Sequence, residues 1–344
     1  MPAAAVRILM LTPFQKKQRG NSVTSARLQN GLRGRGYQVD RLSMENDSYR
    51  KSLADAVSSG EYGLIHAFHA KYCGQALAAV PELKKLPLLL TTTGTDLHYD
   101  LLGQGRSAVL TAFNTARKIV VFNEYFRQIF LDHYPEVVAK LRTIPQGVTL
   151  EAGKAINREQ LGIAGDQFVF LLPSGLRPVK NIVMALNALQ RLREQFPKIR
   201  LVIIGTAIDE QYSRQIAQRF EKLEWVSHYS EIPHEDMRAY LELGDVVLNT
   251  SQAEGQPQGA LEAMSLGKPC LLTAVPGNLN LITAGVEGFY IHNEDELFIL
   301  AKKLIEDSAM RLRMGGAARR LVESKFTPGP EIQAYQELYR EILT

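Results

Sequence analysis

Cysteine is scarce in this sequence: 344 residues contain only Cys73 and Cys270. The two are far apart and show no paired spacing, so neither a metal-binding cysteine motif nor a disulfide framework is indicated. So few cysteines are typical of a reducing compartment, and we expect a cytoplasmic protein. Apolar runs of membrane-spanning length are also lacking. The short apolar run near the N-terminus ends at Thr12-Pro13, which favours a first strand over a signal peptide.

Glycine-rich cofactor motifs are missing after the predicted strands. The pattern Gly-x-x-Gly-x-Gly at residues 31–36 falls at the end of a predicted helix, so it is a helix stop and not a dinucleotide fingerprint. A nicotinamide oxidoreductase and a P-loop enzyme are therefore disfavoured. The net charge of +4 is too small and too scattered for nucleic-acid binding. It suits a phosphate-bearing ligand, or weak contact with an anionic membrane surface.

The order of predicted elements indicates the fold class. The length suggests two domains, and 45% hydrophobic with 22% charged residues is ordinary for a globular protein. Buried-type strands alternate with loops and helices in both halves, which predicts two α/β domains with doubly wound parallel sheets. We expect the first domain at residues 1–150 and the second at residues 151–329. Strands are predicted at 6–11, 37–42, 62–66, 88–92, 118–122 and 141–144, then at 167–172, 200–205, 225–229, 245–249 and 270–275.

The segment 251–269 contains the most informative pattern. A buried strand precedes it, and Glu254 follows in a turn rich in glycine and proline. A short helix is predicted from about Gly259, and it ends before Gly267-Lys268-Pro269. Free N–H groups at the start of such a helix attract an anion. Pro257 has no N–H, so we expect the donors to be the backbone amides of Gln258, Gly259 and Ala260.

Two carboxylates flank this predicted anion site. Glu254 opens the turn, and Glu262 is placed in the first turn of the helix. Taken singly, they would be a solvated loop acid and a helix-capping acid. Next to a phosphate, however, carboxylates serve as acceptors for hydroxyl groups. The implied ligand has a phosphate in the middle and hydroxyl-rich parts at both ends, and a nucleotide-sugar fits this description.

The spacing Glu-x7-Glu, followed by Ala263-Met264 and Gly267-Lys268-Pro269, resembles the retaining glycosyltransferases of family 4, which have the GT-B fold. The resemblance implies two Rossmann-like domains that face each other across a cleft. It assigns residues 1–150 to the acceptor side and residues 151–329 to the donor side, with a C-terminal helix at about 330–344 crossing back onto the first domain. In that family the first glutamate, here Glu254, contacts the donor sugar, and the second, here Glu262, holds the ribose hydroxyls.

Further residues match the family's diphosphate and base contacts. Lys180 matches the phosphate-binding lysine of the family. The usual position of the family's arginine falls on Gly175 here, and Arg177 replaces it three residues before the lysine. Two positive charges that follow a strand suit a diphosphate. Ile232 falls where the family's backbone binds the base.

The N-terminal domain carries two more matches. Gly20 is the expected point of close backbone approach to the diphosphate, beside Asn21. The stretch from Arg19 to Thr24, with Arg27, resembles a small branch that includes the glycosyltransferase 1 domain-containing proteins and, more distantly, the selenosugar synthases. The segments 94–96, 177–180 and 276–278 resemble the same branch.

One position departs from the family pattern. Many members have a histidine near the transferring sugar where this sequence has Thr93. His69 and His98 are candidates to replace it, although a lone histidine near a strand end is more often structural. We expect Asp96 and Asp100 to contact the acceptor or the sugar.

The sequence therefore predicts a retaining glycosyltransferase that uses a nucleoside-diphosphate sugar and an unidentified small-molecule, lipid or glycan acceptor. By family frequency the donor nucleotide is UDP and the sugar an N-acetylhexosamine. No cofactor is expected, and the absence of any Asp-x-Asp motif predicts independence of a divalent metal. The alternatives are an epimerase or phosphorylase of the same fold, or a nucleotide-binding relative without turnover.

Overall fold

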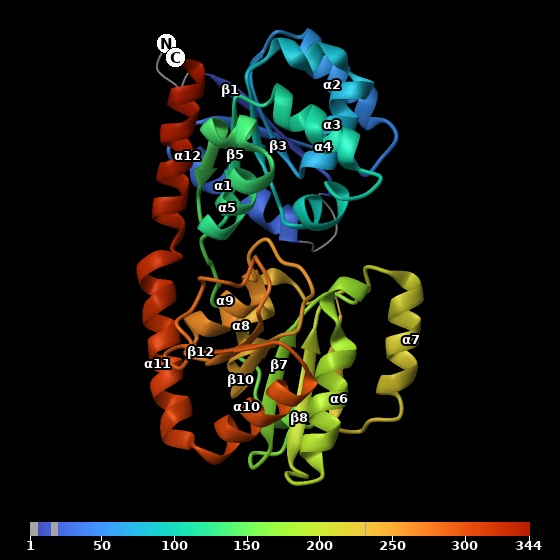
Figure 1. Ribbon diagram of the computed structural model, residues 1–344, viewed down its shortest axis with the longest axis vertical. Helices are drawn as coiled ribbons and strands as arrows, with labels where there is room; N and C mark the ends of the chain where they lie inside the picture. The colour runs from blue at the N-terminus through green and yellow to red at the C-terminus, as the bar shows by residue number, and fades with distance from the viewer. Residues whose placement is uncertain (1–5, 15–19, 231) are drawn as a thin grey trace. The chain divides into compact units, whose positions relative to one another are not determined.

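A computed structural model describes residues 6–14, 20–230 and 232–344 of the chain. It divides into two compact units, unit 1 with Met1–Gly147 and Pro328–Thr344 and unit 2 with Val148–Thr327. Each unit contains one six-stranded parallel sheet with helices on both faces (Figure 1). The prediction of two doubly wound α/β domains is confirmed. Within the described residues, no helix combines the length and the apolar character needed to cross a bilayer.

Unit 1 begins with the predicted strand–helix alternation. The sheet order is β2-β1-β3-β4-β5-β6. Its inner strands β1, β3, β4 and β5 are mostly apolar because helices cover both faces of the sheet, whereas the edge strands β2 and β6 contain more polar residues. Helices α2, α3, α4 and α5 lie on one face, and α1 and α12 on the other. The elements are β1 (Arg7–Thr12), α1 (Gly20–Arg33), β2 (Gln38–Ser43), α2 (Tyr49–Ser58), β3 (Tyr62–Phe68), α3 (Ala70–Ala79), β4 (Leu88–Thr91), the π-helical turn η3 (Asp96–Asp100), α4 (Arg106–Thr115), β5 (Lys118–Val121), α5 (Glu124–His133), β6 (Leu141–Thr143) and α12 (Pro328–Leu343).

Helix α12 begins earlier than the sequence suggests. The helix expected at about 330–344 begins at Pro328, so Pro328 and Pro330 both lie in its first turn. Proline is tolerated there because the first amides of a helix have no intrahelical acceptor. The helix lies along the unit 1 sheet beside α1 (Figure 1), where it buries Tyr335 and Tyr339.

A buried polar chain joins α12 to strands β3 and β4. His66 Nδ1 lies 2.8 Å from the Tyr339 hydroxyl, and His66 Nε2 lies 2.8 Å from Thr91 Oγ1. The Tyr335 hydroxyl lies 3.1 Å from the same Thr91 oxygen. The imidazole is fully buried and stacks on Phe68. Burial lowers the pKa of His66 to about 3, so this side chain is neutral in the folded protein.

The buried His66 makes stability depend on pH. In the unfolded chain the pKa of His66 is about 6.5. Between pH 6.5 and 3, His66 is therefore protonated in the unfolded chain and neutral in the folded chain. The free energy of unfolding is therefore fully retained above pH 6.5 and declines as the pH falls below this value. Between pH 7.5 and 5, we expect the wild type to lose about 2 kcal/mol more unfolding free energy than His66→Gln in urea denaturation. A His292→Gln control, in which the replaced imidazole is exposed, should behave as wild type. Equal pH dependence of wild type and His66→Gln would refute this.

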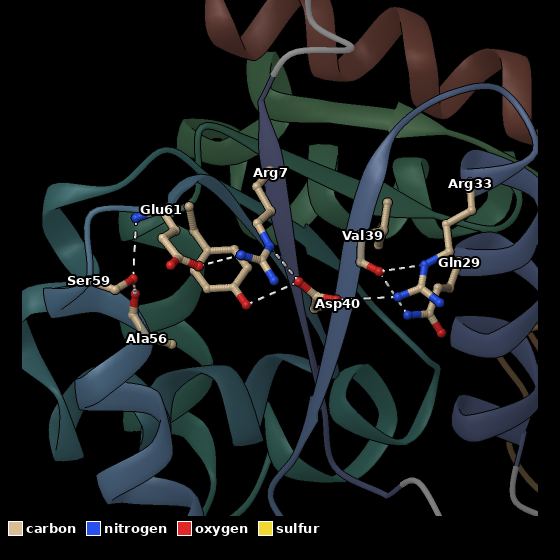
Figure 2. A network of polar contacts seen from close by, with 9 residues as sticks. Arg7, Gln29, Arg33, Val39, Asp40, Ala56, Ser59 and Glu61 are labelled. Carbon is tan, nitrogen blue, oxygen red and sulfur yellow. Dashed lines mark hydrogen bonds and ion pairs between the residues drawn. The ribbon is translucent and has the colours of Figure 1, made fainter.

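A second polar network lies where β1 and β2 begin. Asp40 accepts hydrogen bonds from Arg7 Nε (2.7 Å) and the Tyr62 hydroxyl (3.1 Å), and Arg7 also pairs with Glu61 (Figure 2). Arg33 donates to Val39 C=O. The side chains of Arg7 and Asp40 are about one-third exposed, and such pairs contribute little stability. Because it lies at the amino ends of the strands, this network is away from the end where ligands of such sheets bind.

Unit 2 repeats the architecture with the sheet order β12-β11-β10-β7-β8-β9. Helices α6, α7 and α10 cover one face, and α8, α9 and α11 the other. Strand β12 was not predicted, because its four residues contain a glycine and a tyrosine and give no periodic signal. The elements are β7 (Phe168–Pro173), α6 (Ile182–Arg193), β8 (Ile199–Ile204), α7 (Glu210–Phe220), β9 (Val226–Tyr229), α8 (Met237–Glu242), β10 (Val246–Asn249), α9 (Gln258–Ser265), β11 (Cys270–Thr273), β12 (Gly288–Ile291), α10 (Glu294–Glu306) and α11 (Ser308–Lys325).

Candidate active site

The candidate site of unit 2 lies where the strand order reverses. From β7 the chain proceeds to β8 and β9 on one side, and from β10 to β11 and β12 on the other. Ligands of open α/β sheets bind at the carboxyl ends of the strands that flank such a reversal. Two hydrogen bonds join the segments that follow β7 and β10: Gln252 N–H donates to Val179 C=O (2.8 Å), and Thr250 Oγ1 to Lys180 C=O (3.0 Å). Lys180 and Glu254, predicted separately, thus come together.

Glu254 is held by several partners. Its Oε1 accepts hydrogen bonds from Lys180 Nζ (2.6 Å), Ser251 Oγ (2.6 Å) and Asn249 Nδ2 (2.9 Å), and the side chain is 8% exposed. Burial alone would raise the pKa of Glu254. The charge of Lys180 and the three hydrogen bonds outweigh burial and leave that pKa below its ordinary value. The carboxylate is therefore ionised and fixed in orientation at neutral pH.

A second layer of buried groups positions these partners. Asn278 Nδ2 donates to Asn249 Oδ1 (3.1 Å) and to Thr273 C=O (2.9 Å). Gly277 packs directly on the Glu254 backbone, since a Cβ there would lie 2.1 Å from its carbonyl oxygen. These roles were not predicted from the sequence. The signals were the Asn that ends β10 and the Pro-Gly-Asn segment at 276–278.

Lys180 is paired with Glu254. The resemblance assigns Lys180 to a diphosphate, which stays a prediction; in the structure its ammonium group pairs with Glu254 and its side chain is 15% exposed. Burial lowers the pKa of Lys180. Glu254 opposes this effect, and the nearby charge of Arg177 adds to it. Arg177 immediately precedes the short turn Pro178–Lys180. Arg177 thus lies close enough to Lys180 for its charge to affect the pKa of that lysine.

Helix α9 presents free amides. It begins at Gln258, as the residue pattern predicted to within one position, and it buries Leu261 and Met264. The expectation for Gln258 needs correction, because its N–H donates to Gln256 C=O (2.9 Å). In the described part of the chain, the N–H groups of Gly259 and Ala260 have no acceptor. A helix N-terminus with two free amides attracts an anion.

Glu262 also lies on α9, but not in its first turn as predicted. The helix starts at Gln258, so Glu262 is one turn further on. It is 6% exposed, and its Oε1 lies 3.3 Å from His234 Nε2. His234 follows Ile232, whose side chain is buried among the apolar residues that cover α9. Residue 231 is outside the described residues. Along the chain, the free amides of Gly259 and Ala260 thus lie between Glu254 and Glu262.

The other predicted site residues belong to unit 1. Gly20 is the first residue of α1, and a Cβ there would have no atom of the described residues within 4 Å. Packing among the described residues therefore does not explain this glycine. Asn21 follows in the same helical turn and is partly buried. Arg19, which belongs to the same motif, is outside the described residues.

The prediction that Asp96 contacts a substrate needs correction. Its side chain is fully buried, and it accepts hydrogen bonds from the N–H groups of Ala70 (2.8 Å), Thr93 (3.0 Å) and Gly94 (2.9 Å). A carboxylate occupied by three amides holds backbone in place. Asp96 therefore fixes the segment after β4 against the start of α3. Asp100 instead pairs with Lys71 (2.8 Å).

Neither cysteine has the environment of a nucleophile. Both are buried and unpaired with each other, and burial raises the pKa of Cys73 to about 12. Desolvation likewise raises the pKa of Cys270. Over residues 6–14, 20–230 and 232–344, no group of three or more His, Cys, Asp or Glu side chains is arranged to hold a metal ion.

Known proteins resemble both the sequence and the fold. Residues 153–321 match the family model described as Glycosyl transferases group 1. A glycosyltransferase 1 domain-containing protein 1 from Xenopus tropicalis is 26% identical over 330 residues, which cover 93% of each chain. The Anabaena HepE structure in complex with UDP and glucose has a TM-score of 0.79 at 19% identity, over 98% of this chain and 100% of that one. Sucrose-phosphate synthase from Thermosynechococcus elongatus also has a TM-score of 0.79, at 17% identity, over 98% and 99%. The fold is GT-B, as the resemblance implied.

Proposed function

Because residues 153–321 form a glycosyltransferase group 1 domain, we propose that this protein transfers a sugar from a nucleoside-diphosphate sugar to an acceptor, with retention of anomeric configuration. Unit 2 binds the donor, and unit 1 supplies contacts to the acceptor. The acceptor is a small molecule, a lipid or a glycan.

One observation carries the proposal: the free amides of Gly259 and Ala260 lie between two buried carboxylates along the chain. The amides and the helix dipole suit the diphosphate. Glu262, one helical turn along, suits the ribose hydroxyls. Glu254, fixed and ionised, suits the hydroxyls of the sugar to be transferred. The three parts of a nucleotide-sugar match the three parts of the site in order.

Lys180 and Arg177 contribute charge to the reaction. As the bond from the sugar to the diphosphate breaks, negative charge grows on the leaving phosphate oxygen. The positive charges of Lys180 and Arg177, which lie near each other, stabilise it. That oxygen then accepts the proton of the attacking acceptor on the same face of the sugar, so no side-chain nucleophile is required. The protein's contribution is positioning and electrostatic stabilisation, without a divalent metal.

UDP is the proposed nucleotide. The HepE structure was solved with UDP and glucose, and its fold is shared along the whole chain. Calorimetric titration with UDP, GDP and ADP tests this choice. UDP should bind at least about tenfold more tightly than GDP or ADP. The three ligands differ only in the base, so a difference in Kd reports recognition of the base.

The role of Glu262 gives a sharper test. In Glu262→Gln the ribose hydroxyls would lose a charged acceptor, which is worth about 1.5–3 kcal/mol, so the Kd for UDP should rise about 10- to 100-fold. Glu242→Gln is the matched control, because Glu242 belongs to the preceding helix and its side chain is about half exposed. An unchanged Kd in Glu262→Gln would reject the ribose assignment.

A further inference from the structure

The segment that leads the chain into unit 2, residues 148–158, is held at both ends. At its start, Val148 N–H donates to Phe326 C=O (2.7 Å). At its end, Arg158 donates to Leu243 C=O through both Nε (3.0 Å) and Nη2 (2.7 Å). Between these two anchors the backbone forms neither helix nor strand. We refer to these residues as the connecting segment.

The connecting segment crosses a short 3₁₀ turn, η7 (His234–Asp236), at Gly153. A Cβ at position 153 would lie 2.1 Å from the Glu235 carbonyl oxygen and 3.0 Å from Asp236 Cα. Glycine permits this close approach of two backbones because it has no Cβ. The atoms in the way belong to the backbone, and the connecting segment is held at both ends. A side chain at position 153 would therefore displace the turn.

Turn η7 in turn contacts the carboxylate of Glu262. His234, the first residue of the turn, has its Nε2 at 3.3 Å from Glu262 Oε1. Because the acceptor is a carboxylate oxygen, His234 donates through Nε2. Among the described residues, Oε2 of Glu262 has no hydrogen-bond partner, so this oxygen is left for a ligand hydroxyl. The contact with His234 thus fixes the direction in which the carboxylate faces.

We propose that Gly153 and His234 are positioning residues for the nucleoside end of the donor. The connecting segment holds turn η7 in place through Gly153, and the turn orients Glu262 through His234. The ligand is a nucleoside diphosphate, whose ribose hydroxyls bind Glu262 and whose phosphates bind the amides of Gly259 and Ala260. This inference rests on the proposed function and adds to it the means by which the ribose contact is oriented.

A ligand without ribose hydroxyls, 2′,3′-dideoxy-UDP, isolates the contact in question. We expect the wild type to bind UDP at least about tenfold more tightly than dideoxy-UDP, the value of one hydrogen bond to a charged group. In Gly153→Ala this preference should fall below about threefold, because the Kd for UDP rises while the Kd for dideoxy-UDP stays the same. Calorimetric titration measures both constants. A variant that is merely destabilised would bind both ligands less tightly, which would overturn the proposal.

Gly165→Ala is the matched control. Gly165 is also an exposed loop glycine of unit 2, but a Cβ there would have no atom of the described residues within 4 Å. Its variant should keep the wild-type preference for UDP. An unchanged preference in Gly153→Ala, or an equal loss of preference in Gly165→Ala, would overturn the role of Gly153.

Two substitutions of His234 test the second step. The amide nitrogen of glutamine can take the place of Nε2, so His234→Gln should keep most of the preference for UDP, whereas His234→Ala should lose it. The double variant Gly153→Ala/His234→Ala should lose no more than either single variant, because both changes act on Glu262. Additive losses, or the same Kd for UDP in His234→Gln and His234→Ala, would overturn the proposal.

Failure of this inference is distinguishable from failure of the proposed function. If the wild type bound UDP and dideoxy-UDP equally, the ribose contact and the positioning roles would both be wrong, while sugar transfer from a UDP-sugar would still support the proposed function. If the wild type bound neither ligand and transferred no sugar, the proposed function itself would be wrong.

Discussion

Replacing Glu254 with Gln is expected to lower kcat for sugar transfer by about 10²-fold or more, while the Kd for UDP changes less than about threefold. The amide can keep the contacts of Oε1 with Lys180, Ser251 and Asn249. It cannot present an ionised, acceptor-only group to the sugar. The proposed contacts of the nucleotide lie on α9 and are unchanged. Steady-state kinetics with a UDP-sugar and calorimetry with UDP measure the two quantities separately.

The matched control is Glu287→Gln. Glu287 is equally buried at 8% exposure and lies in the same unit, where Oε2 accepts from Thr283 N–H (2.8 Å). It is not part of the segments that follow β7 and β10, so its variant should keep wild-type kcat. If Glu254→Gln retained kcat within about threefold, or if Glu287→Gln lost as much, Glu254 would not be the sugar contact.

Replacing Glu331 with Ala is expected to destabilise unit 1 by about 3–5 kcal/mol. Glu331 lies on α12 and accepts two hydrogen bonds from Arg27 of α1, at 2.8 and 3.0 Å. The two side chains are only 1% and 9% exposed, so the variant leaves a buried guanidinium without its counter-ion. The free energy of unfolding in urea, followed by circular dichroism, measures the effect.

Glu341→Ala provides the control on the same helix. Glu341 pairs with Lys118 and Arg142, but its side chain is 43% exposed, and we expect a loss of less than about 1 kcal/mol. The double variant Arg27→Met/Glu331→Leu should regain part of the stability, because it leaves no unpaired buried charge. A loss below about 1 kcal/mol in Glu331→Ala would show that water reaches Arg27.

Local patterns predicted the elements of this fold well. Buried strands are recognisable in the sequence as apolar runs. The turn after β10 was predicted from its glycine and proline residues alone. Strand β12 was missed because a four-residue segment with one glycine has no period to detect. Helix α12 starts at Pro328 because the first turn of a helix tolerates proline. The sequence alone does not distinguish a proline in a first turn from one that breaks a helix.

Side-chain partners were harder to predict than positions. Lys180 and Glu254 are 74 residues apart, and their ion pair exists because β7 and β10 are neighbours in the sheet. Asp96 follows a strand and was therefore predicted to contact a substrate, yet its carboxylate accepts hydrogen bonds from three backbone amides. The Pro-Gly-Asn segment at 276–278 did not reveal the partner of Asn278, since that partner is Asn249 of another element. Sequence spacing indicates which residues reach one edge of a sheet, but tertiary packing decides what each one binds.

A crystal structure of the protein with UDP tests the central claim most directly. The predicted result is a diphosphate oxygen within about 3 Å of the backbone nitrogens of Gly259 and Ala260, with the ribose hydroxyls on Glu262. UDP bound elsewhere, or bound with its diphosphate away from the start of α9, would contradict the account.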